Sequence, residues 1–68
     1  MTLVEAIVYL IAGGGHGLTV EQIVAMVNAR QLHRRKDGKP VTLAQVYATI
    51  MRHPEVFVKE DGRIRVIM

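Results

Sequence analysis

The 68-residue sequence contains neither cysteine nor serine. Without cysteine, no disulfide or thiolate metal site can stabilise the fold, so stability must come from apolar packing. Without serine, a serine nucleophile is excluded. The three histidines stand in separate predicted loops without an HExxH pattern, and the six carboxylates show no pairing that helical periodicity would produce. We therefore expect a protein that is not an enzyme and holds no metal or cofactor.

Long apolar runs are also missing. The most apolar stretch runs from Leu3 to Ala12, about ten residues, and it contains Glu5, so it is too short to span a bilayer. It lacks the basic leading segment of a signal peptide. The sequence therefore predicts a cytoplasmic protein with no membrane partner.

Basic residues are absent from the first part of the chain. Residues 1–29 hold two acidic residues and no Lys or Arg, for a charge of −2, whereas residues 30–68 hold nine basic and four acidic residues, for +5. This asymmetry favours a surface that faces a polyanion. Ordinary solvation of a small basic protein would also explain it, and charge alone does not separate DNA, RNA and an anionic membrane.

Three segments begin with Thr and carry Glu or Gln three residues later, which is the capping-box pattern at the start of a helix. The first helix follows Thr2 and ends in the glycine-rich stretch 13–17. It is apolar over most of its circumference, so it either forms the centre of the core or also contacts a second chain. The stretch 13–17 lacks the P-loop pattern and contains no basic residue, which argues against nucleotide binding.

The second helix follows Thr19 and should run to about Gln31. An exposed loop should follow, because Asp37-Gly38 indicates a turn and Pro40 disfavours helix before it. We name residues 33–39 the basic loop. Continuation of the second helix to Arg35 remains an alternative.

The third helix follows Thr42 and is expected to have two different faces. Spacing places these residues on the buried face: Leu43, Val46, Tyr47 and Ile50. It places these on the outer face: Thr42, Gln45, Ala48, Thr49 and Arg52. Thr and Gln can hydrogen-bond base edges, and alanine permits close approach to a groove. A plain solvated face has the same composition, so both interpretations stay open.

Two strands, residues 55–60 and 63–68, are predicted around the Asp61-Gly62 turn. The turn fixes the register, with Glu60 opposite Arg63 and Phe57 opposite Val66. Phe57, Ile64 and Val66 should face the helices, and Glu60 and Arg63 should form an exposed pair.

Helix, helix, basic loop, helix and hairpin together predict a small α+β winged helix-turn-helix, as a single domain over residues 1–68. The sequence also resembles the HARE-HTH winged-helix domain, which is related to the amino-terminal domain of the RNA polymerase delta subunit. The stretches that resemble it are Glu5-Ala6, GLTVEQI (17–23), GKPVT (38–42), VFVK (56–59) and GRI (62–64). Leu32-His33 departs from the family, which often has an aromatic residue there.

The resemblance implies a DNA-binding or chromatin-associated adaptor, and the charge distribution agrees. We expect Arg34, Arg35, Lys36 and Lys39 to contact phosphates. We expect Thr42, Gln45 and Thr49 to face the major groove with Arg52 at its rim, and Arg63 with Arg65 to act from the wing. The alternative is a protein-interaction or dimerisation module without DNA, which would use the apolar first helix. A lone domain of this family would need a homodimer or a partner to bind tightly.

Overall fold

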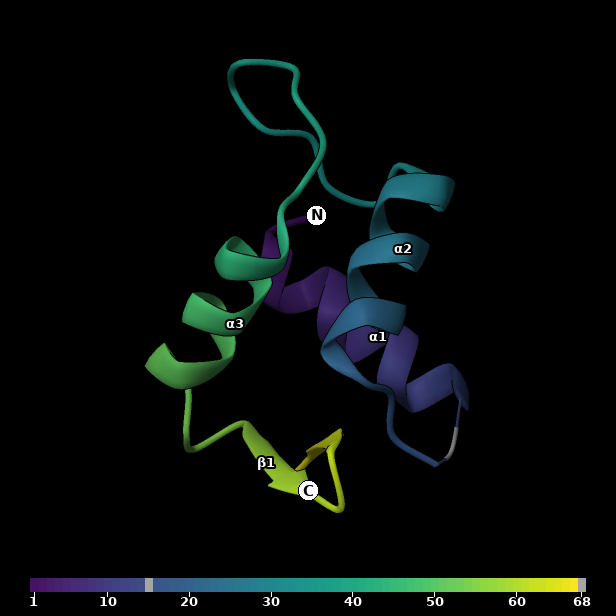
Figure 1. Cartoon of the computed structure of the whole chain (residues 1–68), viewed down its shortest axis with the longest axis vertical. Helices are drawn as coiled ribbons and strands as arrows, with labels where there is room; N and C mark the ends of the chain where they lie inside the picture. Colours follow the sequence, from purple (N-terminus) through teal and green to yellow (C-terminus); the bar gives the residue numbers. More distant parts are fainter. Residues whose placement is uncertain (15, 68) are drawn as a thin grey trace.

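The computed structural model describes residues 1–14 and 16–67 and has three helices followed by an antiparallel hairpin (Figure 1). The elements are α1 (Leu3–Gly14), α2 (Val20–Arg30), α3 (Leu43–Arg52), β1 (Phe57–Glu60) and β2 (Arg63–Val66). This is the predicted α+β winged-helix layout, with the hairpin as the wing. Gly15 of the predicted glycine turn and Met68 of the predicted second strand lie outside the described residues.

The helices begin at the predicted threonines. The Thr2 N–H donates to the Glu5 carboxylate at 2.8 Å, and the Glu5 N–H donates to the Thr2 hydroxyl at 3.2 Å. The same two bonds close a capping box at Thr19, before α2. At α3 only half of the box is present, since Thr42 Oγ1 accepts from the Gln45 N–H at 3.1 Å and the Gln45 side chain does not bond back.

The second helix ends at Arg30, so its continuation to Arg35 is excluded. Gln31 has a left-handed backbone with φ of 52°. The Leu32 N–H then donates to the Val27 carbonyl at 3.0 Å, which satisfies one of the last carbonyls of the helix. Leu32 is half-buried and packs on the core, as its apolar character predicts.

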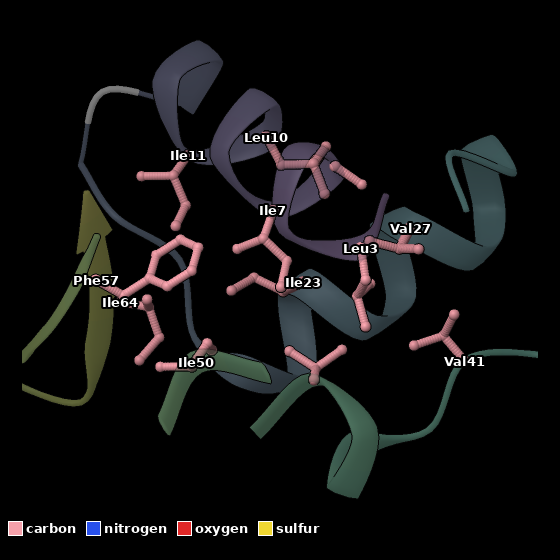
Figure 2. Close-up of a cluster of buried hydrophobic side chains, with 12 residues drawn as sticks. Leu3, Ile7, Leu10, Ile11, Ile23, Val27, Val41, Ile50, Phe57 and Ile64 are labelled. Atoms are coloured by element: carbon pink, nitrogen blue, oxygen red, sulfur yellow. The ribbon is translucent and has the colours of Figure 1, made fainter. Parts of the chain in front are cut away.

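One cluster of buried apolar side chains joins all the elements (Figure 2). α1 supplies its largest share, with Leu3, Ala6, Ile7, Leu10 and Ile11. The Phe57 ring points from the hairpin toward Ile7 and Ile11 in Figure 2. α1 contacts α2, α3 and β2, so the interpretation of the first helix as the centre of the core is confirmed.

The hairpin has the predicted register, with Phe57 opposite Val66 and Glu60 opposite Arg63. The expected Glu60–Arg63 pair is wrong, because Glu60 instead lies 3.6 Å from the Arg65 guanidinium, diagonally across the strands. A single-residue bridge connects the hairpin to the segment before α2. Leu18 and Ile64 exchange backbone hydrogen bonds of 3.1 and 2.7 Å, which fixes the wing to the start of α2.

The first strand is shorter than predicted. It starts at Phe57 rather than at residue 55, because the His53 carbonyl accepts from the N–H groups of both Val56 and Phe57, each at 3.0 Å. These bonds close a tight turn around Pro54, which has no N–H of its own to donate. The turn joins α3 directly to the wing.

Candidate nucleic-acid interface

The basic loop presents three cations to solvent. Arg34, Lys36 and Lys39 are exposed, and none of them forms a salt bridge with the residues that the structure describes. Arg35 differs from them. Its guanidinium lies 3.0 Å from the Asp37 carboxylate and donates to the Pro40 carbonyl at 3.4 Å. Arg35 therefore stabilises the loop through these contacts in addition to contributing positive charge. Arg34, Lys36 and Lys39 are therefore the loop residues best placed for phosphate contacts.

Hydrogen bonds give the tip of the loop a defined shape. The Gly38 N–H donates to the Arg35 carbonyl at 3.0 Å, and Gly38 has φ of 77°, which glycine adopts readily. The Asp37 carboxylate accepts from the Lys39 N–H at 3.0 Å. The predicted Asp37-Gly38 turn is therefore confirmed, and the cations are held on a structured turn.

Asn28 anchors the far end of the loop to α2. Its side-chain amide donates to the Val41 carbonyl at 2.9 Å, and its side-chain oxygen accepts from the Val41 N–H at 2.9 Å. Val41 is itself buried, with 3% of its surface exposed. Sequence reasoning missed Asn28, because the contact joins residues 13 positions apart and no periodic pattern reports such a contact.

The faces of α3 differ from the prediction. Val46 and Ile50 are buried, but Leu43 and Tyr47, also assigned to the buried face, are each 48% exposed. The elements packed against α3 cover Val46 and Ile50 but leave Leu43 and Tyr47 about half exposed, unlike α1, which the other elements cover on several sides. Met51, which was assigned to neither face, is 64% exposed.

The predicted base-reading residues of α3 do not share one open face. Thr42 is exposed, but its hydroxyl is used in the cap. Gln45 and Thr49 are half-buried, and the Thr49 hydroxyl donates to the Gln45 backbone carbonyl at 2.8 Å. The Gln45 side-chain oxygen is buried without a hydrogen-bond partner among the described residues. Gln45 lies beside the basic loop, in a hollow it shares with Arg34 and Arg35.

The wing and the end of α3 supply further positive charge. Arg52 is exposed in the last turn of α3, and Arg63 is exposed directly after the hairpin turn. Arg65 is exposed on the same strand as Arg63, but its guanidinium forms a salt bridge with the Glu60 carboxylate at 3.6 Å. Lys59, which sequence reasoning treated only as a packing stem, is also exposed.

The basic loop and the wing lie at opposite ends of the molecule, with α3 between them (Figure 1). The longest dimension is 31 Å. At 3.4 Å per base pair, a face of that length would cover about nine base pairs. The structure therefore places the predicted phosphate-contacting groups at the two ends of α3 rather than in one cluster.

Two glutamates have lowered pKa values, and neither belongs to the basic loop. The Thr2 backbone N–H, followed by the Thr2 hydroxyl, lowers the pKa of Glu5. The Glu55 backbone N–H, followed by the His53 side chain 3.3 Å away, lowers the pKa of Glu55. In both cases the main cause is a local hydrogen bond near the end of a helix.

The histidines and carboxylates of residues 1–14 and 16–67 are not gathered in one cluster. No three His, Asp or Glu side chains of that part of the chain gather as metal ligands. The His33 ring lies 3.0 Å from the Met1 carbonyl, and the His53 ring lies 3.3 Å from the Glu55 carboxylate. The two histidines therefore have different partners. Within the described part of the chain, no helix has the length and apolarity needed to cross a membrane.

Comparison with known proteins gives no relative for this chain. No family model, no curated protein and no solved structure matches it. The HARE-HTH resemblance therefore stays a prediction that rests on the short stretches quoted from the sequence.

Proposed function

We propose that this protein binds DNA as a small winged-helix, transcription- or chromatin-associated regulator in the cytoplasm. The observation that supports this most is the basic loop, where Lys36 and Lys39 are exposed on a hydrogen-bonded turn and Arg34 is exposed just before it. A preformed turn loses less conformational entropy when it binds phosphates than a mobile chain does. The proposed partner is a polyanion, which fits the +5 charge of residues 30–68.

Phosphate contacts dominate the proposed mechanism. The basic loop binds the backbone at one end of the site, and Arg63 of the wing, assisted by Arg65, binds it at the other. α3 then lies along the major groove between them, with Arg52 at the rim. A few phosphate contacts give dissociation constants of roughly micromolar or weaker at physiological salt, so tight binding needs a dimer on two half-sites or a partner.

A salt titration with matched arginine variants tests the proposal. Arg34→Ala removes an exposed arginine of the basic loop, and Arg30→Ala removes an exposed arginine that lies beside Tyr9 on the α1–α2 side. Each phosphate contact contributes about 0.9 to the slope of log affinity against log salt. Fluorescence anisotropy with a mixed-sequence duplex should give a slope reduced by about 0.9 in Arg34→Ala and unchanged in Arg30→Ala.

Two results would reject this interface. One is the absence of duplex binding by the wild type at low salt. The other is an equal change of slope in the two variants, since that would reflect net charge rather than a contact made by Arg34.

A protein-interaction module is the second candidate, and the exposure of Leu43, Tyr47 and Met51 favours it. Most apolar residues of α1 are used by the chain's own core, so α3 offers the better surface for a homodimer or another protein. Light scattering at high concentration tests self-association directly. A concentration-dependent dimer that does not bind duplex DNA at low salt would establish this candidate in place of the first.

A further inference from the structure

The exposed face of α3 is apolar, although α3 holds the recognition-helix position of the fold. Leu43, Tyr47 and Met51 follow one another at four-residue spacing, so they form one apolar stripe along the helix. Their exposed fractions are 48%, 48% and 64%. The stripe is about 12 Å long at 1.5 Å per residue, so along a major groove it would pass about three to four base pairs.

Positive charge borders the apolar stripe. An open hollow of about 410 Å³ lies beside it, formed by α3, the start of α2 and the hairpin turn, and Lys59 lines that hollow. Lys59 and Glu21 carry opposite charges in that hollow, and further exposed cations lie beyond the two ends of the stripe, in the basic loop before α3 and at Arg52 in its last turn. An apolar strip between cations is complementary to a partner whose apolar groups lie between rows of negative charge. The major groove, flanked by phosphates, has that arrangement.

We propose that the apolar stripe contacts the C5-methyl groups of thymines in the major groove, so that the protein prefers A·T-rich duplexes. This inference rests on the proposed DNA-binding function and adds a base preference to it. The thymine methyl is the apolar group that the major groove displays, and apolar side chains recognise it by contact. A·T and G·C pairs both present hydrogen-bond donors and acceptors there, so the thymine methyl is the group by which leucine and methionine, which make few hydrogen bonds, would distinguish them.

The experiment compares two duplexes of the same A·T-rich sequence, one with thymidine and one with deoxyuridine at every T position. Uracil pairs with adenine as thymine does and lacks only the C5 methyl. Burial of one methyl gives about fourfold in affinity, so anisotropy at low salt should show at least a fourfold preference for the thymidine duplex. Equal affinity for both duplexes overturns this inference and leaves the proposed function standing, whereas binding of neither overturns both.

Matched variants assign the preference to α3. Tyr47→Ser removes an aromatic ring that is 48% exposed within the stripe, and Tyr9→Ser removes one that is 54% exposed on α1. The thymidine preference should fall toward unity in Tyr47→Ser and in Leu43→Ser/Met51→Ser, and should persist in Tyr9→Ser. A preference that survives in the α3 variants overturns the assignment. A wild-type dimer that Leu43→Ser/Met51→Ser dissociates, without a thymidine preference, would show that a second copy covers the stripe instead.

Discussion

Gly17 lies where the backbone before α2 passes close to the wing. It has φ of +76°, and a Cβ built there would lie 2.9 Å from the Ile64 carbonyl oxygen. That carbonyl accepts the hydrogen bond from the Leu18 N–H. A side chain at this position would therefore separate the wing from the helices. Gly13 is different, since nothing lies within 4 Å of a Cβ built there.

Alanine substitutions at these two glycines should have opposite effects. Gly17→Ala forces a left-handed alanine against a backbone carbonyl and should cost at least about 1–2 kcal/mol. Gly13→Ala, inside α1, should stabilise by up to about 1 kcal/mol through helix propensity. Urea unfolding monitored by circular dichroism measures both changes. A Gly17→Ala protein as stable as the wild type would mean that the wing does not sit against Gly17 as described.

The elements themselves were predictable because their signals are local. The threonine caps place the start of each helix, and the two-residue Asp61-Gly62 turn fixes the register of the hairpin. The exposed side of α3 was not predictable in the same way. Periodicity predicts the face of the helix on which Leu43 and Tyr47 lie. The exposed fraction of their side chains depends on how far the neighbouring elements cover that face.

The loop between α2 and α3 depends on one side chain, that of Asn28. Asn28→Ala removes the hydrogen-bond partner of both the N–H and the C=O of Val41, which are partly buried. The substitution should lower the free energy of unfolding by about 1–3 kcal/mol. Asn28→Asp keeps an acceptor for the Val41 N–H and loses the donor to the Val41 C=O. Its stability should therefore lie between that of the wild type and that of Asn28→Ala. Amide hydrogen exchange at Val41 should be faster in Asn28→Ala than in the wild type, and an unchanged exchange rate there would contradict the anchoring role.

At the scale of the molecule, charge and apolar surface are arranged around α3. Exposed cations stand at both ends of the helix, and the apolar stripe runs between them. The sequence predicted the basic loop, because a run of cations with a turn signal is a local pattern. It did not predict the stripe, because exposure of these side chains depends on how the folded elements meet. It also did not predict the hydrogen bonds of Arg35 and Thr49, although these are local and their partners lie two to five residues away.

We propose that duplex DNA binds to one face of the protein, made of the basic loop, α3 and the wing. Amide chemical-shift mapping of the labelled protein with a mixed-sequence duplex at low salt tests it most directly. The largest shifts should fall in residues 34–39, along the exposed side of α3 and at residues 61–63, while the amides of Tyr9 and Arg30 on the α1–α2 side stay unchanged. Shifts centred on Tyr9 and Arg30, or no shifts at all, would contradict it.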